Sequence, residues 1–260
     1  MKELRRKMIT FSLQSGSNGN SIYVETDGIR LLFDAGISGV QAQCRLAHHG
    51  RDIQGVQAII LSHDHQDHVR CAGVCHRKFG IPIYATEPTF SSARRFLGKV
   101  KHVEHFRSGD TIHFNGVCVH SIPTPHDGVD GVCFVVESKG KRLGVFTDLG
   151  HPFRSLREWF PELDAAYLES NYDPDMLEIG RYPEYLKHRI RGEAGHLSNG
   201  EAADLVERFA SPRLKWLALS HLSEENNTPQ LAERETRKVV GKAFPLHVAS
   251  RYSVGSLLTV

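Results

Sequence analysis

The pattern His63-x-His65-x-Asp67-His68 places three imidazoles and one carboxylate within six residues. It directly follows Val56–Leu61, an apolar segment rich in β-branched residues that is typical of a buried strand. Imidazole is the commonest metal ligand in proteins, and imidazole combined with carboxylate suits zinc, manganese or iron. The pattern therefore predicts a metal site at the carboxyl end of a strand. A tight turn there can aim His63 and His65 at one ion, and Asp67 and His68 at a second.

Two ions need more ligands, and four candidates lie downstream. His126, Asp148 and His221 each come just after a segment that we expect to be a strand. A carboxylate such as Asp148 can bridge two ions and neutralise part of the charge of both. The fourth candidate, His196, lies in a Gly-His loop before a predicted helix and can serve catalysis instead. His151 closely follows Asp148 and is the weaker alternative as a ligand.

Apolar periodicity predicts short strands that alternate with helices, in two similar halves of the chain. Strands are expected at Ile9–Leu13, Ser21–Glu25, Ile29–Phe33, Val56–Leu61, Ile81–Ala85, His102–Phe106, Thr111–Phe114, Val117–Ile122, Val132–Glu137, Arg142–Thr147, Ala165–Glu169, Leu214–Ser220 and Leu246–Ser250. Helices are expected at Val40–His49, from the histidine cluster to about Phe79, and at Pro88–Phe96, Leu156–Phe160, Tyr182–Arg191, Glu201–Phe209 and Pro229–Val240. This order indicates an α/β fold, a four-layer αββα sandwich of two mixed β-sheets. No linker or charge block divides the 260 residues, so we expect a single domain over residues 1–260.

Composition adds limits on partners and location. The net charge of +2 does not indicate a nucleic-acid-binding protein by itself, so a polyanion would need a local basic patch. Arg181, Lys187, Arg189 and Arg191 could form that patch, or only an ordinary solvated helix face. The five cysteines form no C-x-x-C pair, and residues 1–7 are basic without an apolar core. We therefore expect a cytoplasmic protein that has no membrane partner.

The ligand pattern resembles the metallo-β-lactamase fold superfamily, and the resemblance spans the chain. It rests on Asp34 in Phe33-Asp34-Ala35-Gly36, the His63–His68 cluster, His126, Asp148 and His221. The resemblance implies that His63, His65 and His126 hold one divalent ion. It also implies that Asp67, His68 and His221 hold the second, and that Asp148 bridges the two. Asp34 would brace the ligand loop from behind.

Further motifs narrow the resemblance. Gly195-His196-Leu197-Ser198, together with Glu169 in Leu168–Asn171, is similar to the loop histidine and its orienting glutamate in phosphodiesterases of the ribonuclease Z type. The segments Ser15–Asn20, His126-Asp127-Gly128 and Leu222–Pro229 resemble the YycJ/WalJ branch, bacterial cytoplasmic proteins regarded as DNA exonucleases.

This resemblance implies a phosphodiesterase that depends on two metal ions and acts on DNA from the 5′ end. A metal-bound hydroxide would attack phosphorus, His196 would act as the general acid, and Asp67 and Glu169 would complete the catalytic set.

Several alternatives stay open at this point. A hydrolase of the same fold could act on a cyclic phosphodiester, a lactone or a thioester, and a ribonuclease Z-like enzyme would act on RNA rather than DNA. A member that no longer catalyses could bind nucleic acid or protein. His196 could simply cap the helix that begins near Asn199, and Ser15–Asn20 could be only a turn or could touch phosphate. The sequence does not choose between zinc, manganese and iron, and it does not fix the oligomeric state.

Overall fold

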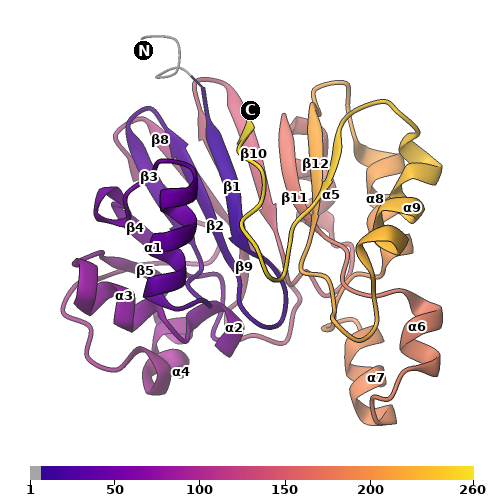
Figure 1. The fold of residues 1–260 in the computed structure, drawn as a ribbon, viewed down its shortest axis with the longest axis horizontal. Helices are drawn as coiled ribbons and strands as arrows, with labels where there is room; N and C mark the ends of the chain where they lie inside the picture. The colour runs from indigo at the N-terminus through magenta and orange to yellow at the C-terminus, as the bar shows by residue number, and fades with distance from the viewer. Residues whose placement is uncertain (1–6) are drawn as a thin grey trace.

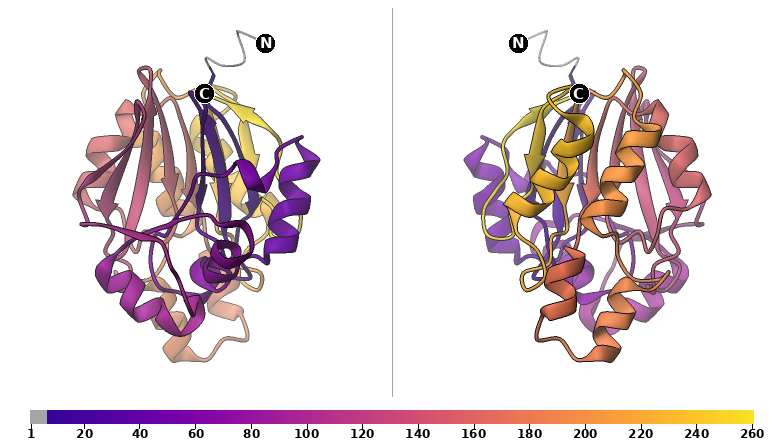
Figure 2. Two further views of the ribbon diagram at one scale, coloured as in Figure 1. Left: turned by 90° about the vertical axis from the view of Figure 1, so that its left-hand side faces the viewer. Right: turned by 90° about the vertical axis from the view of Figure 1, so that its right-hand side faces the viewer.

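Two seven-stranded β-sheets pack face to face, and helices cover the outer face of each sheet (Figure 1). The computed structural model describes residues 7–260, so most of the basic start, residues 1–6, lies outside the described residues. This arrangement confirms the predicted αββα sandwich. Figures 1 and 2 place the C-terminus at one end of the sheets and the helices α2 (Gln66–Val69), α6 (Pro174–Ile179) and α7 (Glu184–Arg191) at the opposite end.

The first sheet has the strand order β14-β1-β2-β3-β4-β5-β6. Its strands are β1 (Ile9–Gln14), β2 (Ser21–Thr26), β3 (Ile29–Phe33), β4 (Ala58–Ile60), β5 (Ile83–Thr86), β6 (Val103–Phe106) and β14 (Leu258–Thr259). The pairs from β14 to β3 are antiparallel, and those from β3 to β6 are parallel. The sheet is therefore mixed, with its parallel strands on one side.

The second sheet repeats this pattern with the order β13-β12-β11-β10-β9-β8-β7. Its strands are β7 (Thr111–Phe114), β8 (Val117–Pro123), β9 (Val132–Ser138), β10 (Lys141–Phe146), β11 (Ala165–Glu169), β12 (Trp216–Ser220) and β13 (Leu246–Val248). The pairs from β7 to β10 are antiparallel, and those from β10 to β13 are parallel. Since parallel strands end at the same edge, the residues after β10, β11 and β12 lie together.

Strand periodicity explains how each sheet buries both of its faces. Leu31 and Phe33 of β3 face the core between the two sheets, whereas Leu32 faces the core beneath α1, α3 and α4. In β9, Phe134 faces the core between the sheets and Val135 faces the core beneath α5, α8 and α9. Successive side chains of a strand point to opposite faces, so two apolar faces require nearly continuous apolar runs. The helices are α1 (Gly39–His48), α2 (Gln66–Val69), α3 (Ala72–Phe79), α4 (Glu87–Leu97), α5 (Arg154–Trp159), α6 (Pro174–Ile179), α7 (Glu184–Arg191), α8 (Asn199–Phe209) and α9 (Pro229–Val240).

The single helix predicted from the histidine cluster to Phe79 is wrong, because the structure has two helices, α2 and α3. The carbonyl groups of Asp67 and His68 accept hydrogen bonds from the backbone N–H groups of Asn20 (2.7 Å) and Ala35 (2.7 Å). These two carbonyl groups therefore do not accept the intrahelical hydrogen bonds of a continuous helix. Gly36 permits this close approach, because a Cβ there would lie 1.5 Å from the carbonyl oxygen of Asp67.

Two more elements differ from the prediction. The helix α6 was not predicted, and the strand at Leu246–Ser250 is shorter and is not the last one. After β13 the chain returns to pair β14 with β1, and Trp216 Nε1 donates to the Thr259 carbonyl at 2.8 Å. A strand of two residues carries no periodicity that a sequence could reveal. Within residues 7–260, no helix combines the length and apolar character that a membrane crossing requires.

Candidate metal centre

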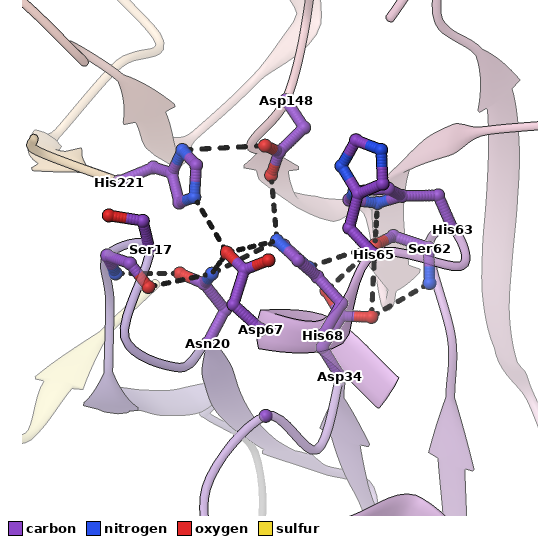
Figure 3. A network of polar contacts seen from close by, with 12 residues as sticks. Ser17, Asn20, Asp34, Ser62, His63, His65, Asp67, His68, Asp148 and His221 are labelled. Atoms are coloured by element: carbon purple, nitrogen blue, oxygen red, sulfur yellow. Dashed lines mark hydrogen bonds and ion pairs between the residues drawn. The ribbon is translucent and has the colours of Figure 1, made fainter. Parts of the chain in front are cut away.

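The predicted ligands converge where strands of both sheets end (Figure 3). His63 follows β4, Asp148 follows β10 and His221 follows β12, each within three residues of the strand end. His126 follows β8 in the same way. Figure 3 shows Asp67 and His68 rising from α2 toward Asp148 and His221. The sandwich therefore brings together residues that lie more than 150 positions apart in the chain.

His63, His65 and His126 form one group of donors, which we call the three-histidine group. Their ligand atoms lie within 4.8 Å of one another, and His126 Nε2 is 3.3 Å from His65 Nδ1. His126 Nδ1 donates to the carbonyl of Gly195 at 2.7 Å, which leaves Nε2 unprotonated in the neutral ring. His63 Nε2 is buried without a hydrogen-bond partner among residues 7–260. These nitrogens have the arrangement that a bound cation requires.

Asp67, His68 and His221 form a second group, which we call the mixed group. Asp67 Oδ2 lies 3.4 Å from His68 Nε2 and 3.4 Å from His221 Nε2. His68 is completely buried. One carboxylate oxygen and two imidazole nitrogens thus face a common point.

Asp148 lies between the two groups. Its Oδ2 is 3.1 Å from His68 Nε2, and its Oδ1 is 3.5 Å from His221 Nδ1 and 3.7 Å from His126 Nε2. His63, His68 and Asp148 themselves form a set of donors within 4.8 Å. Asp148 Oδ2 is buried and forms no well-directed hydrogen bond to any residue from 7 to 260. A carboxylate in this position can contact a cation on either side.

The electrostatics of the two groups differ. Burial lowers the pKa of His63 well below its usual value, and the neighbouring His68 lowers it further. Burial also lowers the pKa of His221, but Asp148 and Asp67 outweigh this effect and raise it to about 10. Burial likewise lowers the pKa of His65 and of His126. The three-histidine group therefore presents neutral imidazoles, the form that binds metal, whereas carboxylates favour positive charge at the mixed group. The buried, unpartnered donors and this charge distribution fit divalent cations.

Asp34 holds the ligand turn in place. Its carboxylate accepts hydrogen bonds from the backbone N–H of Ser62 at 2.8 Å and from the Ser62 hydroxyl at 2.9 Å. It also accepts from His68 Nδ1 at 2.7 Å. The proton is thereby held on Nδ1, and Nε2 is left to face Asp67 and Asp148. The structure thus places Asp34 behind the candidate ligands, where a bracing role was predicted.

The loop Ser15–Asn20 is more than a turn. Asn20 Nδ2 donates to Asp67 Oδ2 at 3.0 Å, and the Ser15 hydroxyl accepts from the backbone N–H of His221 at 2.8 Å. Asn171 Nδ2 donates to the His221 carbonyl at 2.7 Å. The loop therefore contacts two members of the mixed group, a role that was not predicted. The run of small polar residues was the only sequence signal for it.

Glu169 and His196 form a hydrogen-bonded pair beside the two groups. His196 Nδ1 donates to Glu169 Oε1 at 2.7 Å, and Glu169 Oε2 accepts from the backbone N–H groups of Leu149 (2.9 Å) and Leu197 (3.2 Å). Burial raises the pKa of Glu169, but His196 outweighs it and lowers the pKa to about 2. A buried carboxylate anion therefore orients the ring. The side chain of His196 is 18% exposed, so a substrate can reach it.

Two alternatives for the histidines can now be decided. The helix α8 is capped by Ser198, whose hydroxyl accepts from the backbone N–H of Glu201, so His196 does not cap it. His151 donates from Nδ1 to the carbonyl of Glu193 at 2.7 Å and belongs to neither donor group.

The predicted basic patch is largely neutralised. Lys187 is buried and donates to the Glu178 carbonyl at 2.6 Å, while Arg191 pairs with the Glu178 carboxylate at 2.6 Å. Arg189 is held by Asp127, whose Oδ1 also lies 3.3 Å from His65 Nε2. The interpretation as a solvated face therefore fits most of this helix. The place of Asp127 beside the three-histidine group was not predicted.

Three residues of the centre have left-handed backbone conformations. Asp34 has φ 63°, Asp148 has φ 57° and His221 has φ 55°. Such angles are uncommon for residues other than glycine, although Asp and His adopt them more often than most. Asp34 and His221 directly follow β3 and β12, Asp148 lies two residues after β10, and each turns its side chain back into the centre. The sharp turn explains how strand ends from two sheets aim at one place.

The chain belongs to the metallo-β-lactamase superfamily. A family model described as "Beta-lactamase superfamily domain" matches residues 29–218. The chain is therefore an enzyme of the metal-dependent hydrolase class.

Among curated relatives, it is 33% identical to Exodeoxyribonuclease YycJ of Bacillus anthracis, covering 90% of this chain and 92% of the relative. It is 36% identical to Exodeoxyribonuclease WalJ of Streptococcus pneumoniae, covering 85% of this chain and 83% of the relative. The crystal structure of the metallo-β-lactamase fold protein YhfI from Bacillus subtilis matches with a TM-score of 0.75 at 16% identity, covering 98% of this chain and 100% of that chain. The predicted superfamily and the resemblance to the YycJ/WalJ branch are confirmed.

Proposed function

We propose that this protein is a phosphodiesterase with two divalent ions that removes nucleotides from an end of DNA, beginning at the 5′ end. The observation that carries the proposal is the pair of adjacent donor groups, with Asp148 between them and the Glu169–His196 pair beside them. The relatives named exodeoxyribonucleases support DNA as the substrate.

His63, His65 and His126 would hold one ion, and Asp67, His68 and His221 the other, with Asp148 shared by both. Histidine and carboxylate donors suit zinc, manganese and iron. The chemistry that two bound ions supply is polarisation of the phosphoryl group and a lowered pKa of the attacking water. The chain itself fixes the donors: Asp34 sets the tautomer of His68, and Asn20 orients Asp67.

His196 is the general acid in this proposal. The leaving group of a phosphodiester is an alkoxide, which leaves poorly and needs a proton as its bond to phosphorus breaks. Glu169 binds Nδ1–H and stabilises the positive ring, so Nε2–H is the proton that passes to the leaving oxygen. General acid catalysis of this kind typically contributes about 10²- to 10⁴-fold. A thiolate or an activated aryl leaving group would need this help far less.

The test compares the metal-loaded wild-type protein with His196→Ala. The substrates are single- and double-stranded DNA and RNA, labelled at either end, and an activated aryl phosphodiester. We expect the wild type to shorten DNA stepwise from the 5′ end. His196→Ala should lose about 10²- to 10⁴-fold on DNA and retain most activity on the activated ester.

A matched control is His151→Ala, since His151 contacts only the Glu193 carbonyl among hydrogen-bond partners in residues 7–260. This variant should behave as the wild type. If neither nucleic acid is degraded while esters, lactones or thioesters are hydrolysed, the nuclease proposal is wrong. If the wild type binds DNA but turns over no substrate in any metal, a non-catalytic binding role replaces it. Metal content of the active protein tests the number of ions, and full activity with one ion would contradict the second site.

A further inference from the structure

A cleft lies between the loop that follows His221 and the C-terminal segment of the chain. It has a volume of about 320 Å³ and is lined by Leu222–Glu224, Asn227–Gln230 and Val248–Tyr252. Ligand pockets have volumes of roughly 300–1,000 Å³, so this cleft has room for one small group rather than for a duplex.

The C-terminal segment is tied to the loop that contacts the centre. The Ser15 N–H donates to the Ser250 carbonyl at 3.0 Å, and Asn18 Nδ2 donates to the Arg251 carbonyl at 3.1 Å. Arg251 donates to the Leu222 carbonyl at 2.9 Å and to the Ser17 hydroxyl at 3.2 Å. In Figure 1 this yellow segment descends to the turn between β1 and β2. The cleft lining is thus hydrogen-bonded to the loop whose Ser15 and Asn20 contact His221 and Asp67.

Tyr252 is an exposed aromatic ring held in a fixed position at this cleft. The residue is 67% exposed. Its hydroxyl donates to Glu224 at 2.5 Å, its carbonyl accepts from Arg45 at 2.8 Å, and its N–H donates to Ser250 Oγ at 3.1 Å. A tyrosine that is fixed at both ends and leaves its ring in water offers a flat surface at little entropic cost.

The charge at the cleft favours a base over a phosphate. Glu224 is the acidic group there, and its pKa is lowered by the hydrogen bond from Tyr252 and by the charge of Arg251, which lies 3.0 Å away. The carboxylate and the guanidinium therefore neutralise each other. The rest of the lining is uncharged and combines apolar side chains such as Leu222 and Val248 with polar ones such as Asn227 and Thr228. An uncharged, flat group fits these surroundings, whereas an unpaired phosphate does not.

We propose that this cleft binds one nucleobase of the DNA strand, stacked on Tyr252, next to the phosphodiester that is cleaved. The proposal rests on the proposed function and extends it, because it assigns a subsite for an unpaired nucleotide. Stacking on an aromatic side chain accepts any base, so the subsite would not read sequence. It would instead require that the base be unstacked from its neighbours before cleavage.

The test uses single-stranded oligonucleotides with phosphorothioate linkages that resist cleavage, bound to the metal-loaded protein. One abasic residue is placed at each of the first few positions from the attacked end. At one position, the missing base should weaken wild-type binding by roughly 5- to 150-fold, the range for a single stacked base. In Tyr252→Leu this penalty should disappear, and in Tyr252→Phe, which keeps the ring, it should remain.

A second readout is the fluorescence of 2-aminopurine at that position, which stacking on Tyr252 should quench and Tyr252→Leu should restore. The matched control is Tyr185→Leu, since Tyr185 on α7 is 76% exposed and does not line the cleft. This variant should keep the loss of binding affinity that the abasic residue causes. The inference is overturned if wild-type DNA cleavage is normal but no position shows a penalty, or if Tyr252→Leu keeps it. If the wild type neither binds nor cleaves DNA, the proposed function fails, and the inference with it.

Discussion

Replacing Asp34 by asparagine should weaken metal binding without unfolding the chain. Asparagine keeps an oxygen for the Ser62 backbone N–H at 2.8 Å, but it then turns its NH₂ group toward His68 Nδ1, which lies 2.7 Å from the present carboxylate. Two donors cannot share that contact. The His68 proton would move to Nε2, which is the atom that faces Asp67 and Asp148. A protonated nitrogen cannot bind a cation, so every binding event must first reverse this change.

We expect the affinity for an ion at the mixed group to fall by about 10- to 100-fold, the range typical of residues that orient metal ligands. This loss corresponds to roughly 1.4–2.7 kcal/mol. Competition of zinc with a chromogenic chelator measures it, and thermal unfolding checks the fold. The matched control is Asp64→Asn, because Asp64 accepts from the Val129 N–H at 2.9 Å and does not touch His68. Unchanged zinc affinity in Asp34→Asn, with a normal melting temperature, would refute this account of the tautomer.

Three other predictions follow from contacts in the structure. Glu169→Gln removes the charge that stabilises the protonated His196 ring, so kcat on DNA should fall by about 10²- to 10⁴-fold, with much less effect on an activated aryl ester. Gly36→Ala places a Cβ 1.5 Å from the Asp67 carbonyl oxygen and should destabilise the fold by about 3 kcal/mol or more in urea unfolding. The control is Gly140→Ala, where a Cβ meets no atom within 4 Å, so only the strain of its positive φ should count, at about 1 kcal/mol. Burial raises the pKa of Asp164, but Arg213 and Lys141 outweigh it and lower that pKa. The stabilisation is therefore fully present above the pKa of Asp164 in the unfolded chain, near 4, and is lost as the pH falls through its lower pKa in the folded protein. Asp164→Asn should accordingly destabilise the fold by about 1–2 kcal/mol at pH 7 and by less below pH 4.

The parts of the fold that follow from local periodicity were predictable. Val132–Glu137 is apolar at nearly every position because β9 buries both faces, and such a run indicates an internal strand. The break between α2 and α3 was not predictable, because it depends on backbone partners at Asn20 and Ala35, far away in the sequence. The two-residue strand β14 forms only because the chain end returns to β1.

The candidate ligands were predictable because neither packing nor solubility requires His and Asp side chains to gather at strand ends. The residues that hold them were harder to find. Asn20 and Asn171 are ordinary polar residues in the sequence, and only the fold brings them to Asp67 and His221. The basic residues of α7 show the opposite error: Lys187 has the charge expected of a phosphate ligand, yet the structure buries it against α6. Sequence patterns show which groups are present, and tertiary contacts decide which of them stay available.

The left-handed conformations of Asp34, Asp148 and His221 have a consequence for directed evolution of this enzyme. Each such residue stores strain on the order of 1–3 kcal/mol, which glycine would release. A screen for thermostability alone would therefore be drawn to these three positions, because single replacements there relax the backbone. Each replacement would also delete a candidate metal ligand or the residue that braces one. Selection for heat resistance and selection for turnover would favour opposite residues at the same three codons, so a stabilised library must be screened for activity in every round.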